Sequence, residues 1–139
     1  MQVSFQKMHE SAIVPSRHFS AGGFDVCTPD DAHLAQWIVT KIPLGFATEF
    51  PDGMRAVLHD RSSMAALGLH VVGGLIDSDF RGQWILLLLN SSPNSITLSA
   101  GAKVAQVKFE IVPCTTWKVV DELHESNRGT GAFGSSGAS

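Results

Sequence analysis

Glycine and proline interrupt this chain at short intervals, and this spacing limits what the chain can fold into. The runs between them are short and rich in Val, Ile, Phe and Trp, residues favoured in pleated strands. Many short strands separated by turn residues are typical of an all-β sandwich or barrel. The interrupting residues are Pro15, Gly22, Gly23, Pro29, Pro43, Gly45, Pro51, Gly53, Gly68, Gly73, Gly74, Gly82, Pro93, Gly101 and Pro113.

Hydrophobic periodicity predicts the individual elements. Residues 105–111 alternate apolar and polar without exception, as a half-buried strand does. Residues 84–89 are continuously apolar and predict a central strand buried on both faces. Residues 62–69 form the one helix that we expect, capped by Asp60 or Ser62. Strands are predicted at 2–7, 23–27, 37–42, 46–50, 55–59, 69–72, 83–90, 95–98, 103–112 and 116–120.

The overall composition favours one globular domain. With 139 residues the chain can build one modest core, and 44% hydrophobic with 17% charged residues indicates a folded rather than a disordered chain. The net charge of -3 argues against a protein that coats DNA or RNA, because such proteins need a basic face. A pocket for a small phosphorylated ligand needs only a few local cations.

The cysteines and the N-terminus bear on the cellular compartment. Cys27 and Cys114 lie outside any zinc-binding pattern, so free thiols in a reducing compartment are expected, with one disulfide as the alternative. The N-terminus shows no charged leader followed by an apolar run, as a signal peptide would. The apolar run 84–89 is too short for a membrane span. We therefore expect a cytoplasmic protein that does not enter the membrane.

The segment 73–82, GGLIDSDFRG, places charges between two apolar runs. Asp77, Asp79 and Arg81 would each cost several kcal/mol to bury without a partner. We therefore expect a turn at the rim of a sheet, with its charges facing a ligand or solvent. A solvated hairpin tip is the simpler explanation when the segment is considered alone.

The last residues, 127–139, are rich in glycine and serine and cannot bury enough surface to order themselves. A disordered tail or linker is the simplest interpretation. Arg128 and Phe133 suggest another, a lid whose ring stacks on a base and whose arginine contacts phosphates. We accordingly divide the chain into a β domain, residues 1–123, and a flexible arm, residues 124–139.

Three further segments have a composition typical of functional sites. Arg61 can make bidentate contacts, and Ser62 and Ser63 at a helix start add neutral donors. A capped helix with a surface Arg–Asp pair explains the same residues. Gln106 puts an amide on the polar face of a strand, and Asp25 places an acid just after a flexible turn.

Taken together and in order, these segments resemble the five motifs of the homotrimeric dUTPases, which hydrolyse dUTP to dUMP and pyrophosphate. Each segment is unspecific alone, but the third and fifth at this distance and in this order are highly specific. The resemblance spans nearly the whole chain. The segments are 21–26 (AGGFDV), 60–65 (DRSSMA), 74–82 (GLIDSDFRG), 101–106 (GAKVAQ) and 128–137 (RGTGAFGSSG).

The resemblance implies an all-β, jelly-roll-like fold with one short helix, assembled as a homotrimer with three shared active sites. The C-terminal arm is expected to close over a neighbour's site. The implied substrate is dUTP and the product dUMP, an activity that limits uracil incorporation into DNA. Mg²⁺ is the implied cofactor, held mainly by the triphosphate, with Asp25 as a contact through water.

The roles known for the family carry over to matching positions. Asp77 is the expected general base, which orients and deprotonates the water that attacks the α-phosphorus. Phe80 is expected to pack under the deoxyribose and Phe133 to stack over uracil. A hairpin around residues 70–75 is expected to recognise the uracil edge. The remaining expected substrate contacts are Arg61, Ser62, Ser63, Val71, Gly74, Ile76, Gln106, Arg128, Gly134, Ser135 and Ser136.

Two departures from the family pattern concern the site. Phe80 stands where the family usually has tyrosine, and Val71 stands where many members have asparagine, so uracil recognition should rest on backbone groups. Arg81 is expected to form a structural ion pair with Asp79 or with another subunit. Its alternative role is to help hold Asp77 charged.

Other functions fit parts of the sequence. A non-catalytic dUTPase-like protein that binds a nucleotide or a regulatory partner would keep the same fold. A dCTP deaminase would need a glutamate in the third segment and would lack the arm, so Asp77 and residues 128–137 argue against it. A lectin-like or capsid-like jelly roll accounts for the strands, but not for five ordered motifs.

Overall fold

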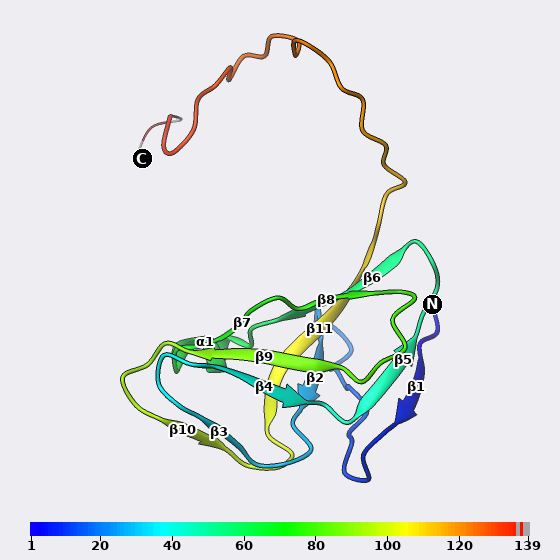
Figure 1. The fold of residues 1–139 in the computed structure, drawn as a ribbon, viewed down its shortest axis with the longest axis vertical. Coiled ribbons are helices and arrows are strands. Elements are labelled where there is room, and N and C mark those ends of the chain that lie inside the picture. Colours follow the sequence, from blue (N-terminus) through cyan, green and yellow to red (C-terminus); the bar gives the residue numbers. More distant parts are fainter. Residues whose placement is uncertain (136, 138–139) are drawn as a thin grey trace.

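The computed structural model describes residues 1–135 and 137. Within them the chain forms eleven strands and one short helix (Figure 1), so the expected all-β class is confirmed. No helix in this part of the chain is long and apolar enough to cross a membrane. The elements are β1 (Ser4–Lys7), β2 (Phe24–Cys27), β3 (Ala32–Leu34), β4 (Val39–Pro43), β5 (Phe46–Glu49), β6 (Met54–His59), α1 (Ser62–Ala66), β7 (Leu69–Val71), β8 (Leu75–Asp77), β9 (Ile85–Asn90), β10 (Ile96–Leu98) and β11 (Lys103–Ile111).

Antiparallel pairing joins the strands into two larger sheets and two ribbons. The four-stranded sheet has the order β2-β11-β6-β8, and the three-stranded sheet has the order β4-β9-β7. The ribbons pair β1 with β5 and β10 with β3. Because β11 lies between β2 and β6, residues from the beginning, middle and end of the β domain meet on one sheet.

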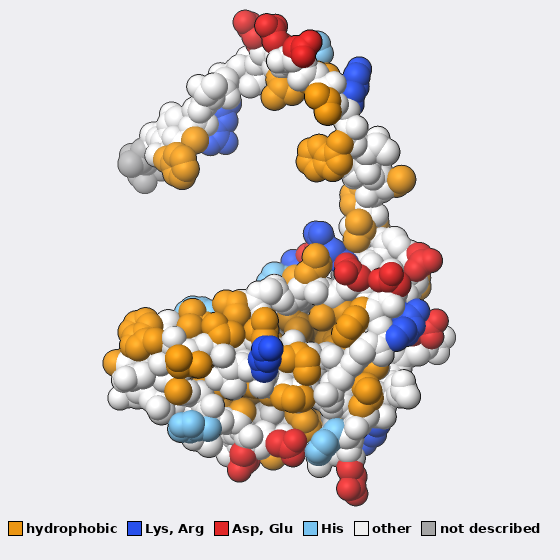
Figure 2. Space-filling view, in the orientation of Figure 1, with side chains coloured by type: hydrophobic (Ala, Val, Ile, Leu, Met, Phe, Trp, Pro, Cys, Tyr) orange, Lys and Arg blue, Asp and Glu red, His pale blue; other side chains and the backbone are white. Residues whose placement is uncertain are grey.

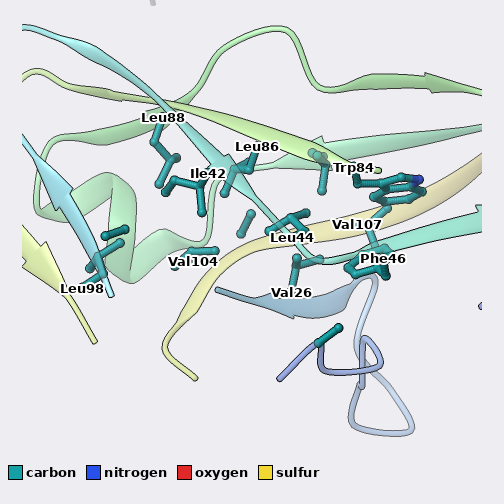
Figure 3. Packing of buried hydrophobic residues seen from close by; sticks show 14 of the residues in the cluster. Val26, Ile42, Leu44, Phe46, Trp84, Leu86, Leu88, Leu98, Val104 and Val107 are labelled. Carbon is teal, nitrogen blue, oxygen red and sulfur yellow. The ribbon is translucent and has the colours of Figure 1, made fainter. Parts of the chain in front are cut away.

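The core lies between the inner faces of the two larger sheets (Figure 3). β9 contributes Leu86 and Leu88 to it, and β11 contributes Val107 from the opposite side. Trp84 is almost fully buried beside Phe46, with ring centroids 5.2 Å apart. Each such side chain stabilises the fold by about 1.5–3 kcal/mol through removal from water.

β9 is the central strand of its sheet, but only one of its faces is buried. Leu86 and Leu88 are fully buried, whereas Ile85 is exposed and Leu87 only half-buried. The prediction of burial on both faces is therefore wrong for the single chain. In the described residues no further layer covers the outer face of the β4-β9-β7 sheet.

Three strand predictions also differ from the structure. β3 and β8 were not predicted; β8 lies within the charged segment 73–82, which was expected to be a turn. The strand predicted at 116–120 is absent. Its apolar side chains Trp117 and Val119 are 96% and 95% exposed, so the described part of this chain gives them no sheet to join.

The helix is shorter than predicted and is not capped by a side chain. α1 has five residues, and Arg61 occupies its N-cap position without a side-chain hydrogen bond to the helix. The Asp60 carboxylate, one of the two expected caps, instead contacts the backbone N–H of Val71 and the ring of His70. Gly68 follows the helix with a φ of 83°, a conformation that glycine adopts without strain.

After β11 the chain leaves the β domain and arches away from it (Figure 1). The last backbone hydrogen bond to the domain runs from Val112 N to Gly53 O at 2.8 Å. Among the residues that the structure describes, no hydrogen bond or ion pair joins 113–135 to the domain. This segment is therefore not held in place by the rest of its own chain.

Candidate active site

Several of the expected site residues share the outer face of the four-stranded sheet. Pairing sets Gln106 of β11 opposite Asp25 of β2 on one side and His59 of β6 on the other. Farther along, Arg55 of β6 pairs with Asp77 of β8. Paired residues point to the same face of a sheet, as do residues two or four apart along a strand, so all five lie on one surface.

Asp25 is the centre of an ion cluster on this face. Its Oδ1 accepts a hydrogen bond from Arg61 Nε at 2.9 Å, and its Oδ2 lies 2.7 Å from Lys103 Nζ. Arg61 Nη1 also donates to the Lys103 carbonyl oxygen at 3.2 Å. The Lys103 hydrogen bond, opposed by partial burial and supported by the charge of Arg61, lowers the pKa of Asp25. Two cations around one carboxylate leave a net positive charge, which suits phosphate.

The side-chain amide of Gln106 is held from two sides. Its Nε2 donates to the Asp60 carbonyl oxygen at 2.8 Å, which orients the amide. On the other side a Cβ at position 23 would stand only 2.9 Å from Gln106 Oε1, so Gly23 makes room for the amide. An amide nitrogen carries two N–H groups, and the second has no partner within the described residues. It is available to donate to a ligand.

A cavity of about 590 Å³ opens beside Gln106. This volume is within the range of about 300–1,000 Å³ that is usual for small-molecule pockets. The lining comes from β6, β11, the glycine turn before β2 and the segment around β7. The lining residues are Gly22, Gly23, Val57, Leu58, His59, Asp60, Val71, Gly73, Gln106, Val107 and Lys108.

The segment between β7 and β8 is a crossing between sheets, not the expected hairpin. β7 pairs with β9 and β8 with β6, so residues 72–74 pass from one sheet to the other. The Gly74 carbonyl accepts a hydrogen bond from Leu58 N at 2.8 Å, and the φ of 86° at Gly74 requires glycine. The Val71 side chain lines the cavity, whereas Ile76 packs against the core.

Asp77 ends β8, and the charged turn follows it. Its side chain is exposed and has no ion-pair partner among the described residues. Phe80 is 42% exposed, and its ring lies so close to position 82 that a Cβ there would stand 2.5 Å from the ring. Gly82 therefore lets the ring of Phe80 fold back over the turn and present its free face.

Arg81 has a structural ion pair, but not with the expected residue. Its Nη2 lies 3.5 Å from Glu49 Oε1, and its Nη1 donates to the Ser78 carbonyl oxygen at 2.6 Å. The prediction that Asp79 is its partner is wrong within this chain. The turn folds the guanidinium back over Ser78 and toward β5, which carries Glu49.

The structure brings Asp25, Arg61 and Gln106 together but leaves Asp77 apart from them. Asp77 and Gln106 lie two strands apart across the sheet and four residues apart along it. With about 4.8 Å between strands and about 3.3 Å per residue, their separation is on the order of 16 Å. Within one chain, the expected general base and the expected phosphate contacts do not face the same phosphate.

The arm residues also lie apart from the cavity. Arg128 Nε donates to the Gly131 carbonyl oxygen at 2.8 Å, which makes a local turn, and Phe133 is fully exposed. Ser135 is exposed in the same region. The expected contact Ser136 lies outside the residues that the structure describes.

Two residues of the site, Lys103 and Asp60, were not expected from the sequence. Both lie inside matched motifs, so the motifs marked their segments. Their side-chain partners belong to other strands, and no local pattern could assign them. The expected contacts Ser62 and Ser63 are exposed at the start of α1, directly after Arg61.

The polar groups around the cavity bear on metal binding. No group of three or more His, Cys, Asp or Glu side chains in the described part of the chain could hold a metal ion. Both oxygens of Asp25 already face cations, Arg61 and Lys103. Because Mg²⁺ keeps several waters and often binds through substrate phosphates, this set of groups fits an ion carried by a triphosphate.

Known proteins resemble this chain over nearly its whole length. The dUTPase family model matches residues 9–137. A deoxyuridine 5'-triphosphate nucleotidohydrolase of Thermobifida fusca is 38% identical, covering 86% of this chain and 69% of that protein. Another, of Nocardia farcinica, is 34% identical, covering 97% and 85%. A mutant dUTPase of Staphylococcus bacteriophage 80alpha with dUpNHpp shares the fold, with a TM-score of 0.91 at 21% identity over 99% of each chain. The chain therefore belongs to the dUTPase family.

Proposed function

We propose that this protein hydrolyses dUTP to dUMP and pyrophosphate, with Asp77 as the general base for attack of water on the α-phosphorus. The observation that carries the proposal is the match of nearly the whole chain to relatives named for this activity. Removal of dUTP would limit uracil incorporation into DNA.

The phosphate end of the substrate is assigned to Arg61 and Gln106. Catalysis at phosphorus depends mostly on positioning and on stabilising negative charge. Arg61 uses Nε on Asp25 and Nη1 on the Lys103 carbonyl, which leaves further N–H groups for phosphate oxygens. These partners hold the guanidinium before substrate arrives. Ser62 and Ser63 would each add a hydroxyl donor at the start of α1.

The reacting end of the substrate is assigned to the turn after β8. The exposed Asp77 has both carboxylate oxygens available to hold and deprotonate a water molecule. The free face of the Phe80 ring offers an apolar surface to the deoxyribose and no partner for a 2′-hydroxyl. Backbone groups at Val71, Gly74 and Ile76 are assigned to the uracil edge.

The complete site is assigned to neighbouring copies in a homotrimer. The separation between Asp77 and Gln106 supports this arrangement, because a second copy could bring the missing half to each pocket. The outer face of the β4-β9-β7 sheet supports it too, since it carries Val39, Ile85 and Leu87 in an uncovered row. Figure 2 shows hydrophobic side chains gathered over this part of the domain. Such patches usually mark interaction surfaces.

The arm, residues 124–139, is assigned to closing a neighbour's site. Phe133 would stack on uracil. Arg128, Ser135 and Ser136 would contact the phosphates, and the backbone of Gly134 would approach the substrate closely. The extended path of the arm away from its own domain (Figure 1) supports this assignment.

Mg²⁺ is assigned to the triphosphate, where it would neutralise part of the phosphate charge when bound. Asp25 would contact the ion only through water, because Arg61 and Lys103 occupy its two oxygens. The two cysteines, Cys27 and Cys114, are free thiols, and we propose a cytoplasmic location because free thiols persist in a reducing compartment.

The proposal is tested by measuring pyrophosphate release by the purified protein with Mg²⁺. We expect release from dUTP and little release from dCTP, dTTP or UTP. Equal release from dCTP, or none from dUTP, contradicts the proposal. Tight binding of dUTP without release would identify a non-catalytic nucleotide-binding member of the family, and release of ammonia from dCTP would identify a deaminase.

A further inference from the structure

Asp60 connects the two larger sheets at the wall of the cavity. It follows the last residue of β6, in the four-stranded sheet. Its Oδ1 accepts a hydrogen bond from the backbone N–H of Val71, and its Oδ2 lies 3.0 Å from His70 Nδ1. Both of these partners belong to β7, in the three-stranded sheet. The carbonyl oxygen of Asp60 accepts the amide hydrogen bond of Gln106 at 2.8 Å.

These contacts fix the crossing segment 72–74 at the end where it leaves β7. At its other end the Gly74 carbonyl accepts a hydrogen bond from Leu58 N. No ladder of backbone hydrogen bonds joins β6 to β7, since they belong to different sheets. β7 is held on its own sheet by its ladder with β9, and the Asp60 carboxylate adds a direct side-chain link from the end of β6, beside Gln106, to β7.

The charge of Asp60 also argues for an indirect role. A carboxylate in contact with a triphosphate would repel it. Both oxygens of Asp60 are engaged by Val71 and His70, and its side chain is only 33% exposed. Val71 has no polar side-chain group and its N–H is donated to Asp60, so at this position the base can be recognised only through the backbone carbonyl, which the Asp60 contact helps to orient.

We propose that Asp60 is a positioning residue that sets the base-facing segment at Val71 against the phosphate-facing amide of Gln106, and so determines the preference for uracil. This inference rests on the proposed hydrolysis of dUTP. The side chain acts through its two neighbours and touches no reacting atom.

The test compares substitutions at Asp60 by their effects on KM, kcat and base preference. Asp60→Ala removes the acceptor, so KM for dUTP should rise on the order of tenfold while kcat changes less. The ratio of kcat/KM for dUTP to that for dCTP should fall on the order of tenfold. Asp60→Asn keeps an acceptor for the Val71 N–H and should stay within about threefold of wild type.

A second variant and a matched control separate positioning from folding. Asp60→Glu keeps the charge but moves the acceptor by one methylene, so base preference should fall even where Asp60→Ala does not fold. Asp31 offers the control, because its Oδ1 also accepts a backbone N–H, from Ala100 at 2.7 Å, outside the residues that line the cavity. Asp31→Ala should leave KM and base preference unchanged.

Two outcomes overturn the inference. One is wild-type KM and base preference in both Asp60→Ala and Asp60→Glu, even with a lower melting temperature. The other is an equal change in Asp31→Ala. A wild-type protein that releases no pyrophosphate overturns the proposed function instead, and calorimetric binding of dUMP then gives the same comparison. In that assay, Asp60→Ala must bind more weakly than Asp31→Ala.

Discussion

The ion cluster around Asp25 and the arm are opposite kinds of structure on one chain. In the cluster, contacts of 2.7–3.2 Å join Asp25 of β2, Lys103 of β11 and Arg61, which directly precedes α1. The arm and the segment that leads into it, residues 113–135, make only local hydrogen bonds among the described residues. The difference shows that the groups assigned to phosphate are already held by their own chain, whereas the described arm residues are not; in the proposed function, substrate and a neighbouring copy would order the arm.

The largest expected effect follows from splitting the site between copies. Asp77→Asn should lower kcat by about 10²–10⁴-fold, because the general base is lost while dUTP still binds. Arg61→Ala should be nearly as inactive, because it removes the cation that is assigned to the phosphates and leaves only Lys103 in the cluster. When the two variants are unfolded and refolded together, activity should return to about a quarter of wild type, the share of sites with one intact half from each copy.

The mixture is measured by pyrophosphate release against each variant refolded alone. Near-normal turnover by Asp77→Asn alone would remove the general base from its assigned role. A mixture no more active than its components would show that each chain completes its own site. The contrast between the ion cluster and the arm would then not reflect a site shared between copies.

Removal of the arm is expected to have the next largest effect. Deletion of residues 128–139 should lower kcat/KM on the order of 10²-fold, because the stacking ring and the phosphate contacts are lost. The melting temperature should stay close to wild type, since the described arm makes no hydrogen bond to the domain. Kinetics and thermal melts of the same preparation test this, and a large drop in melting temperature would make the arm a structural element.

A smaller effect is expected from disturbing the preformed side. Gly23→Ala adds a Cβ that would stand 2.9 Å from Gln106 Oε1, so the amide must move and KM should rise on the order of fivefold. Gly22→Ala is the matched control, because a Cβ there meets nothing within 4 Å. Steady-state kinetics of the two variants test whether KM depends on the room that Gly23 leaves for the Gln106 amide. Equal KM values would show that it does not.

The smallest effect concerns the contribution of the cluster to stability. The pKa of Asp25 is lowered in the folded state, mainly by the Lys103 hydrogen bond, from an ordinary value of 3.8. The ionised Asp25 carboxylate therefore stabilises the folded protein at pH values above 3.8, and this stabilisation is lost as the pH falls through the lower pKa of Asp25 in the folded state. Asp25→Asn should cost on the order of 1 kcal/mol at pH 6 in urea unfolding, and the difference should shrink below pH 4.

Asp121→Asn, in the exposed segment that leads into the arm, is the control for this measurement. It should show no difference at either pH. A difference for Asp25→Asn that persists unchanged at pH 3 would mean that the carboxylate charge does not contribute to the cluster.

Sequence patterns predicted the class of fold and most strands, because side-chain alternation is a local property. Residues 105–111 alternate, and Ala105 and Val107 on the apolar face are indeed buried, although Ile111 at the end of β11 is exposed. The patterns failed where the answer depends on distant parts of the chain. The run 84–89 is apolar on both faces, but what covers its second face is decided outside that strand.

For the candidate site too, motifs pointed to individual residues but not to their partners elsewhere in the chain. Motif order pointed to Arg61 and Gln106, and the fold brings them near each other, since Gln106 pairs with Asp25, which accepts a hydrogen bond from Arg61. It could not show that β7 and β8 belong to different sheets, or that Arg81 pairs with Glu49, since those partners are set by strand register. The links through Asp60 were hidden for the same reason.

The exposure of Trp117 has an optical consequence. The chain contains three tryptophans and no tyrosine, so indole dominates its near-ultraviolet emission. Trp84 is 1% exposed in the core, whereas Trp117 is 96% exposed on the segment leading into the arm. Indole in water emits at longer wavelengths than indole in an apolar environment. Because Trp37 is also 65% exposed, the emission of a Trp37→Phe variant would report on Trp117, and any surface that covers Trp117 would shift that emission toward the blue.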